Sequence, residues 1–574
     1  MPYRALALDF DGTLTRDGRL GDDVATAIEQ VRAAGCRVLL VTGRILDELR
    51  REVPDIDRRF DALVGESGAV LSGFGGVHLL ALPVEWELSA ALQKAGVPHQ
   101  RGQVLLACDA RDRARVVAEI SRLGLDAQLV RNRGALMVLP GGVSKGTGVL
   151  HALSHLGISF HSALAIGDAE NDLALLASCE LGVGVADSVE SLKQHADVIL
   201  KQPDGAGVVS FLRGPVVEGR ERVHSRHRQV ELGRGPAGAP VTIPASQVSV
   251  LILGGSNRGK SYVAGLLAEQ LIEQAYSVLV VDPEGDHIGL GALPGTVVIG
   301  GTRPLLEPEG LLRILDHRFG SVIIDLSALP HEQTATYAAR LAPAVAAHRA
   351  SNGLPHWVVV DEAQRHVLLG GPWHSLLASP IRGVCLITYQ PARLPPEEVA
   401  SIDAIVVAGE LDGGAGDVLA RFGEEQGVDV AEVAAAAAHL RANQALLVQR
   451  GTRAVCTLRA RATPHVRHMH KYVQIDLPVE HSFYFERGWG DPTGMVAANL
   501  GAFRQLLEIC ESSSLAHHLR GGDFSRWVEG VIADDELAAA LRSVEERRAA
   551  PLHISLDEAR RELIAAIENR YSVW

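Results

Sequence analysis

Short apolar runs alternate with longer amphipathic stretches over the first 60 residues of the chain. The runs at residues 5–8 and 36–41 predict buried strands, because short continuous apolar runs are typical of parallel sheets. The stretches at residues 21–34 and 46–52 have the spacing of helices. Strands that alternate with helices predict a Rossmann-like α/β core, in which functional loops lie at the carboxyl ends of the strands.

The first run ends in Asp9-Phe-Asp-Gly-Thr-Leu-Thr15. The side chain of Asp9 and the main-chain carbonyl of Asp11 can reach one hard cation such as Mg²⁺. Asp9 could then attack a phosphorus atom, while Asp11 handles the proton of the leaving group. A lone D-x-D pair would be better interpreted as an acidic loop without catalytic function. The choice therefore depends on whether partner residues follow later in the chain.

Partner residues follow in order. The second run closes on Val41-Thr-Gly-Arg44, and a later one, residues 163–167, runs into an acid. A compact lysine between them could neutralise a phosphoryl group. The predicted phosphate-binding residues are Thr42, Gly43, Lys145 and Asn171, and the predicted metal-binding residues are Asp9, Asp11, Asp168 and Asp172.

This set resembles the haloacid dehalogenase (HAD) phosphatases, specifically the Cof-type subclass IIB. Asp9 and Asp11 match its first motif, Thr42 the second, Lys145 the third, and Gly167-Asp168 with Asn171-Asp172 the fourth. Gly65-Glu-Ser-Gly-Ala69 and Ala196-Asp-Val198 also match. The resemblance implies a phosphoaspartyl intermediate on Asp9, with Asp11 as general acid and then base. It also implies that residues 80–139 form a small α/β cap that selects a small phosphorylated metabolite, although shielding the site from water is an alternative role.

Residues 213–247 interrupt the alternation, since Gly, Pro, Arg and His dominate there. We expect a partly flexible connector with a basic character. A solvated linker is favoured over a contact with nucleic acid or phosphate.

A second functional segment begins with an apolar run at residues 248–253 and continues into a predicted helix at 262–274. Between them lies G-x-x-x-x-G-K-S, whose backbone amides cradle phosphates, whose lysine reaches the terminal phosphates and whose serine ligates Mg²⁺. The predicted nucleotide-binding residues are Gly254, Gly255, Ser256, Asn257, Arg258, Gly259, Lys260, Ser261 and Gln390. Asp361 and Glu362 end another apolar run, where they could hold Mg²⁺ through water and orient the attacking water.

The runs ending at Asp282, Asp325 and Gln390 narrow the type of ATPase. They resemble the HerA-type branch of the HerA/FtsK ATPases, which implies a RecA-like fold, a γ-phosphate sensor at Gln390, hexameric rings and DNA pumping. Two differences from these ATPases weaken the interpretation that the protein pumps DNA. The β-barrel that usually precedes the ATPase core is missing, and four arginines compete as a trans-acting finger: Arg340, Arg349, Arg382 and Arg450.

Residues 463–574 predict a small, mainly helical domain, with helices near 497–510, 532–541 and 556–569. Its default role is docking or oligomerisation. His465, His468 and His470 could bind a metal, but no carboxylate or cysteine is placed to complete the site. Phosphate binding or a structural role is favoured.

Composition restricts the function further. A net charge of −14 and an aromatic content of 4% argue against a basic, stacking-rich nucleic-acid binder. The six cysteines are scattered without a C-x-x-C pair, and no apolar run could span a membrane, so we expect a soluble cytoplasmic protein.

The expected domains are residues 1–212, 248–462 and 463–574, with the linker at 213–247.

The leading hypothesis is a bifunctional enzyme that uses Mg²⁺ and ATP: a phosphatase joined to a HerA-type ATPase. One alternative is an ATP-driven nucleic-acid translocase whose phosphatase trims an end or a nucleotide. Another is a regulatory assembly in which the ATPase gates the phosphatase. The partners expected are a small phosphorylated metabolite, ATP and copies of the same chain in a hexamer; nucleic acid stays open.

Overall fold

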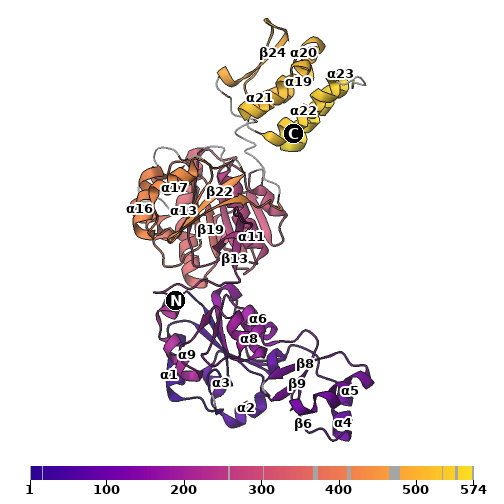
Figure 1. Ribbon diagram of the computed structural model, residues 1–574, viewed down its shortest axis with the longest axis vertical. Coiled ribbons are helices and arrows are strands. Elements are labelled where there is room, and N and C mark those ends of the chain that lie inside the picture. Colours follow the sequence, from indigo (N-terminus) through magenta and orange to yellow (C-terminus); the bar gives the residue numbers. More distant parts are fainter. Residues whose placement is uncertain are drawn as a thin grey trace.

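The computed structural model describes residues 2–15, 17–132, 134–255, 259–301, 303–365, 373–409, 411, 415–441, 443–463, 473, 477, 479–532, 534–549 and 554–571. Figure 1 shows three α/β or helical units that follow one another along the longest axis. No helix among the described residues is long and apolar enough to cross a membrane. Ser256, Asn257, Arg258 and the cluster of His465, His468 and His470 lie outside the described residues.

The first unit contains an eight-stranded sheet of order β12-β11-β10-β1-β2-β3-β4-β5. The strands from β12 to β3 are parallel, and β4 and β5 add an antiparallel hairpin. β1 lies between β10 and β2 and is buried throughout, which explains its uninterrupted apolar sequence. The strands are β1 (Ala5–Asp9), β2 (Arg37–Val41), β3 (Ala62–Gly65), β4 (Val70–Gly73), β5 (Gly76–Leu79), β10 (Ala163–Gly167), β11 (Leu181–Gly184) and β12 (Val198–Ile199). The main helices are α1 (Asp22–Ala33), α2 (Leu46–Glu52), α6 (Lys145–His155), α7 (Leu173–Ala177), α8 (Glu190–His195) and α9 (Asp204–Leu212).

The expected insertion forms a separate four-stranded sheet of order β6-β7-β9-β8 with two helices. One face of this cap sheet packs on its own helices through residues such as Leu106 and Val138. The alternate positions, including Val130 and Met137, pack against the phosphatase core. The elements are α4 (Trp86–Lys94), β6 (His99–Arg101), β7 (Leu106–Asp109), α5 (Arg113–Leu123), β8 (Ala127–Asn132) and β9 (Ala135–Pro140).

The second unit contains an eleven-stranded sheet of order β14-β13-β23-β22-β21-β15-β20-β19-β16-β18-β17. The strands from β21 to β17 are parallel, and the other four are antiparallel. The parallel strands are β15 (Val250–Leu253), β16 (Val278–Asp282), β17 (Thr296–Gly300), β18 (Ser321–Asp325), β19 (Trp357–Val360), β20 (Val384–Thr388) and β21 (Ala404–Val407). The antiparallel strands are β13 (Gln229–Arg234), β14 (Pro240–Pro244), β22 (Gln444–Gln449) and β23 (Thr452–Leu458), and the longest helices are α11 (Lys260–Glu273) and α13 (His331–Asn352).

The expectation of a linker over residues 213–247 is wrong for most of its second half. β13 and β14 lie there and extend the large sheet through β23. Val230, Leu232, Val241 and Ile243 are buried, with the alternation of strands. The Gly- and Pro-rich segment between them is the turn of a hairpin, and its composition concealed two short strands.

The third unit combines the expected helices with a hairpin, β24 (Phe483–Gly488) and β25 (Asp491–Ala497). Its core is an aromatic cluster that includes Phe483, Phe503, Phe524 and Trp527. His518 is structural here, since it contacts Asp523 and accepts the Glu486 N–H. The helices are α19 (Leu500–Ile509), α20 (Ser512–Gly521), α21 (Asp523–Trp527), α22 (Asp535–Ala549) and α23 (Leu556–Tyr571).

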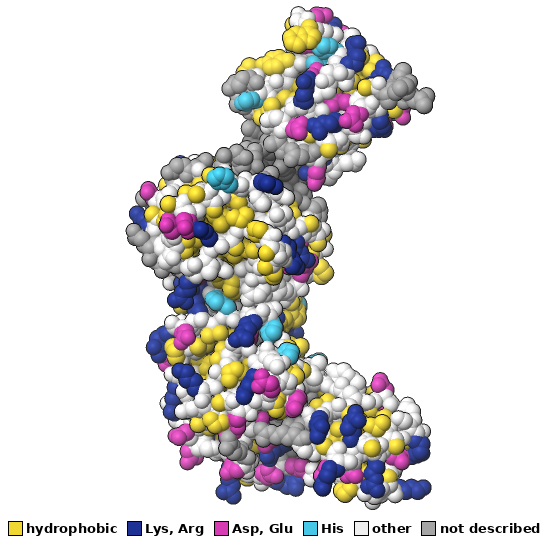
Figure 2. Space-filling model, in the orientation of Figure 1, with side chains coloured by type: hydrophobic (Ala, Val, Ile, Leu, Met, Phe, Trp, Pro, Cys, Tyr) yellow, Lys and Arg dark blue, Asp and Glu magenta, His cyan; other side chains and the backbone are white. Residues whose placement is uncertain are grey.

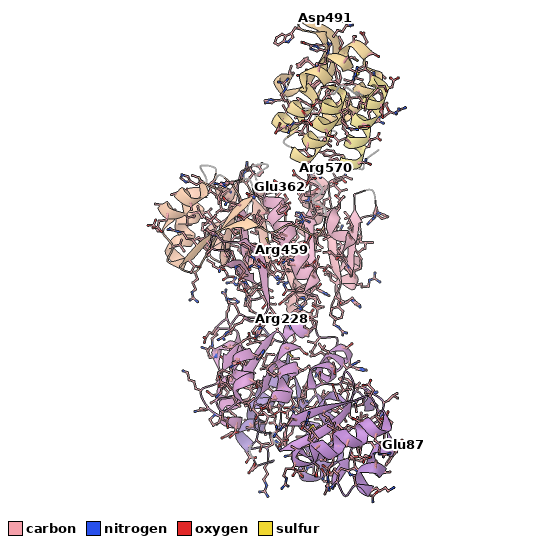
Figure 3. All side chains as sticks on the ribbon, turned by 45° about the vertical axis from the view of Figure 1, so that its right-hand side comes forward. Glu87, Arg228, Glu362, Arg459, Asp491 and Arg570 are labelled. Carbon is pink, nitrogen blue, oxygen red and sulfur yellow. The ribbon has the colours of Figure 1, made fainter. Side chains whose placement is uncertain are left out.

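The first two units meet at the amino-terminal edges of their sheets. Glu180, just before β11, receives hydrogen bonds from Tyr276 Oη at 2.8 Å and from His161 Nδ1 at 2.7 Å. The rings of His161 and Tyr276 are stacked at 3.5 Å. Arg228 lies at this junction, and Glu362 lies at the opposite end of the second unit (Figure 3). The carboxyl ends of the two parallel sheets therefore point away from each other.

Candidate functional site

The predicted phosphatase residues converge at the carboxyl ends of β1 and β10. These strands are parallel neighbours, so their terminal acids Asp9 and Asp168 lie side by side. Lys145 Nζ lies 2.6 Å from Asp9 Oδ1 and 2.6 Å from Asp172 Oδ1. Oxygens of Asp9, Asp168 and Asp172 lie within 4.8 Å of one another. All four side chains are buried.

This concentration of buried charge shifts the pKa values of its members. Burial and the nearby Asp172 raise the pKa of Asp9 well above its ordinary range, although Lys145 opposes the shift. Burial lowers the pKa of Lys145, but the Asp172 and Asp9 carboxylates outweigh that effect and raise it overall. A divalent cation would relieve the remaining repulsion between the acids.

The donor set fits Mg²⁺, which prefers carboxylate and carbonyl oxygens. Both polar atoms of the Asn171 side chain are buried without a hydrogen-bond partner among the described residues, so Asn171 has bonding capacity left for a ligand. Asp172 differs from this picture. Its Oδ2 accepts the N–H groups of Asp168 and Ala169, and its Oδ1 faces Lys145, so it organises the site.

Asp11 is held outside this cluster by Arg44. The guanidinium donates to both carboxylate oxygens, Nε to Oδ2 at 2.8 Å and Nη2 to Oδ1 at 2.5 Å. Arg44 also contacts Glu52 and lies over the Phe10 ring. Arg44 ends the motif Val41-Thr-Gly-Arg44, but the sequence alone gives it no role. Only the fold shows that it pairs with Asp11.

Thr42 and Gly43 lie beneath the cap. The buried Thr42 Oγ1 accepts the Arg44 N–H at 3.1 Å, which leaves its own proton for a phosphate oxygen. A Cβ on Gly43 would lie 2.6 Å from Met137 Cε of the cap, so a larger residue there would displace the end of the Met137 side chain. On the other side, β8 of the cap lies against residues 170–172. The cap thus covers the site from two sides.

The described part of the phosphate loop has the expected geometry. Gly254 has φ 154°, and a Cβ there would lie 2.0 Å from Ala408 O. Gly259 has φ 93° and directly precedes α11, which places Lys260 and Ser261 at a helix N-terminus. Lys260 Nζ donates to Gly255 O at 2.7 Å. Gly254, Gly255, Gly259, Lys260 and Ser261 therefore lie between the carboxyl end of β15 and the N-terminus of α11.

The acidic residues lie close to this loop, because β20 alone separates the strand of the loop, β15, from the strand of Asp361, β19. Asp361 Oδ2 contacts His287 Nε2 at 2.9 Å. Glu362 has φ 48° and accepts from Gln364, whose Oε1 accepts the Thr388 hydroxyl at 2.7 Å. Thr388 Oγ1 also accepts the Gln390 N–H at 3.0 Å. Gln390 Oε1 is buried without a hydrogen-bond partner among the described residues.

His287, Gln364 and Thr388 were missed by sequence reasoning. His287 follows Asp-Pro-Glu-Gly-Asp286, and a histidine after an acidic turn carries no specific signal without the fold. Thr388 stands two residues before Gln390 and could have been found as the polar end of an apolar strand. Gln364 and Thr388 connect Glu362 to the main chain of Gln390, and His287 contacts Asp361.

Comparison with known proteins identifies relatives of the first unit. The model of the haloacid dehalogenase-like hydrolase family matches residues 103–212, and the chain belongs to that family. A phosphoglycolate phosphatase of Archaeoglobus fulgidus is 30% identical over 223 residues, which are 37% of this chain and 96% of the relative. One of Methanothermobacter thermautotrophicus is 28% identical over 228 residues, covering 97% of that protein. A solved sugar phosphatase of HAD subclass IIB is 20% identical, with a TM-score of 0.32, and covers 37% of this chain and 98% of its own.

The second unit has its own match. The model described as the central domain of helicase HerA covers residues 230–338, which include β13 and β14. The chain is therefore a phosphatase of the HAD type that carries a HerA-like P-loop domain.

Proposed function

We propose that the first unit hydrolyses a small phosphomonoester with the help of Mg²⁺ and an aspartyl phosphate on Asp9, and that the second unit binds and hydrolyses ATP. The observation that carries the first part is the buried cluster of Asp9, Asp168, Asp172 and Lys145. Mg²⁺ held by Asp9, Asp168 and the Asp11 carbonyl would polarise the phosphoryl group.

The side chains divide the reaction as follows. Lys145 and the Thr42 hydroxyl hold phosphoryl oxygens, and the Asp9 carboxylate forms a bond to phosphorus as the ester oxygen leaves. Asp11 gives that oxygen its proton, then takes a proton from the water that cleaves the aspartyl phosphate. To reach the leaving group, the Asp11 carboxylate must exchange its contact with Arg44.

The substrate class follows from the cap and the relatives. Val130 and Met137 of the cap pack against the core, so the cap closes over the site and favours a compact ester. The two relatives described above are named phosphoglycolate phosphatases, and this chain covers nearly their whole length. We therefore propose 2-phosphoglycolate as the first substrate to test.

The proposed ATPase rests on the phosphate loop beside Asp361 and Glu362. Lys260 would hold the terminal phosphates, Ser261 and Asp361 would hold Mg²⁺, Glu362 would orient water, and Gln390 would contact the γ-phosphate. The chain Glu362–Gln364–Thr388–Gln390 supports this assignment, because it ties the water-orienting acid to the proposed sensor.

The buried junction favours ATP-dependent gating over independent activities. α11 starts at the phosphate loop and ends next to Gln274, whose carbonyl lies 2.9 Å from His161 Nε2 of the phosphatase unit. Because the amino-terminal edges of the two sheets meet, the sites at their carboxyl ends face away from each other, which argues against direct transfer of a product between them.

The match to a helicase domain supports the translocase as the second candidate. Lys and Arg side chains are interspersed with Asp and Glu on the face shown in Figure 2, without a continuous basic stripe, which favours the metabolite enzyme.

The test is phosphate release from a panel of phosphorylated metabolites with Mg²⁺, for wild type and Asp9→Asn, with and without ATP. Turnover that is lost in Asp9→Asn and changes with ATP supports the gated phosphatase. Turnover retained by Asp9→Asn contradicts the covalent mechanism. ATP hydrolysis stimulated by DNA, without turnover of any metabolite, would favour the translocase.

A further inference from the structure

Glu66 carries a buried carboxylate that no step of the proposed reaction uses. It begins the loop Glu66-Ser-Gly68 after β3, in which three successive residues have left-handed backbone angles, with φ of 51°, 56° and 102°. Residues other than glycine rarely adopt this conformation, because it strains their backbone. Two such residues in succession indicate that the surrounding structure holds this loop in place.

The carboxylate binds one turn of the cap. Glu66 Oε1 accepts the Gln103 N–H at 2.8 Å, and Oε2 accepts those of Val104 at 2.8 Å and Leu105 at 3.0 Å. Together with Gly102, these residues form the turn between β6 and β7, called the cap turn below. A Cβ on Gly102 would lie 2.5 Å from the Glu66 carboxyl group, so this approach requires glycine.

The same loop touches the catalytic segments of the core. The Ser67 N–H donates to Thr42 O at 3.0 Å, and the Glu66 N–H donates to Arg44 O at 3.0 Å. A Cβ on Gly68 would lie 1.8 Å from the carbonyl oxygen of Ser144, the residue before Lys145. The Ser67 hydroxyl lies 3.0 Å from Met137 Sδ of the cap. One loop therefore contacts two catalytic segments and the cap.

We propose that Glu66 is a positioning residue that fixes the cap over the phosphatase site. A carboxylate that satisfies three backbone amides defines both the distance and the orientation of the cap turn. The cap face that carries Met137 then lies over Thr42 and Gly43, where it meets the non-phosphoryl part of the substrate. This inference rests on the proposed phosphatase function and adds the residue that sets its substrate fit.

The kinetic test uses full-length Glu66→Ala and Glu66→Gln with 2-phosphoglycolate and with methyl phosphate, which is too small to need the cap. In Glu66→Ala, kcat/KM for 2-phosphoglycolate should fall about 10- to 100-fold, mainly through KM, because a misplacement near 1 Å has effects of that size. Methyl phosphate should be affected much less, and Glu66→Gln should be intermediate because one acceptor remains. Equal losses on both substrates would overturn the proposal.

Asp61→Asn is the matched control. Asp61 also accepts a backbone N–H, from Val38 at 2.8 Å, and binds Arg32, but these contacts join core elements only. Asp61→Asn should lower the melting temperature and leave the ratio of kcat/KM for the two substrates unchanged. A ratio that changes as much as in Glu66→Ala would show that general destabilisation explains the effect.

Hydrogen exchange separates the anchor from the chemistry. The amides of Gln103, Val104 and Leu105 should be protected in wild type and exchange faster in Glu66→Ala, even if no ester is turned over. Gly102→Ala alone should also speed the exchange of these amides, because its Cβ clashes with the Glu66 carboxylate. The double variant should exchange no faster than Glu66→Ala, because that clash disappears when the carboxylate is removed. If these amides stay protected in Glu66→Ala, Glu66 does not anchor the cap turn. If the protection is lost in Glu66→Ala but the wild-type protein turns over no ester, the anchor stands and the phosphatase function is refuted instead.

Discussion

Glu180 should hold the phosphatase unit and the P-loop unit together. Its carboxylate accepts from Tyr276, His161 and Ser246, and Arg228 Nε lies 3.5 Å away. Glu180→Ala removes the shared acceptor and leaves these donors buried. Breaking a buried charged network by removing one partner costs about 3–5 kcal/mol. Tyr276→Phe removes one hydrogen bond to a charged group, so we expect about 1.5–3 kcal/mol.

Differential scanning calorimetry of the full-length protein measures the effect. We expect the two units to melt together in wild type, because the Glu180 carboxylate at their junction is buried and hydrogen-bonded from both units. One kcal/mol shifts the melting temperature of a domain of this size by about 2–4 °C. Glu180→Ala should therefore lower it by about 6–20 °C and separate the transitions of the two units.

Glu29→Ala is the control, since Glu29 is an exposed acid on α1. It should leave the melting profile unchanged within about 0.5 kcal/mol. A Glu180→Ala profile that coincides with that of Glu29→Ala would refute the reasoning. The junction would then be a weak contact, and the argument for gating through α11 would fail with it.

Three further predictions concern single side chains. Arg44→Ala should raise kcat for alkyl phosphates, because Asp11 no longer has to leave the guanidinium to reach the leaving group. It should change kcat far less for aryl phosphates with acidic leaving groups, since these do not need a proton from Asp11; equal changes on both would exclude a role through Asp11. His287→Ala should lower Mg²⁺-dependent ATP hydrolysis about 10- to 100-fold, because Asp361 loses its partner, while metal-free nucleotide binding by equilibrium dialysis stays unchanged. Burial raises the pKa of Glu398 to about 7, so the folded state favours its neutral form. The stability this gives is complete below about pH 4.5 and is lost as the pH rises through 7. Glu398→Gln should therefore melt higher than wild type at pH 8 and like wild type near pH 4.5, and a constant difference across this range would contradict the assignment.

The sequence by itself determined the elements and most of the chemical residues. Uninterrupted apolar runs defined buried parallel strands, and the acids of both sites stand directly after such runs. Parallel strands present their carboxyl ends at one edge, so Asp9 and Asp168 could be grouped before any coordinates were known. Lys145 begins α6 instead, and its match to the HAD motifs added it to the group. The cap was also predictable, because residues 80–139 form an insertion between the second motif at Thr42 and the third at Lys145.

Only the tertiary structure decided the contacts between segments that are far apart in the chain. β13 and β14 were hidden by a Gly- and Pro-rich turn. They pair with each other, and β13 joins the sheet by pairing with β23, more than 200 residues later. The Arg44–Asp11 pair, the Glu66 anchor and the Glu180 junction involve side chains whose types carry no specific signal. Whether a carboxylate binds a metal, positions the cap or joins two units depends on its burial and on the hydrogen-bond donors that the fold places around it. Local sequence does not encode these neighbours.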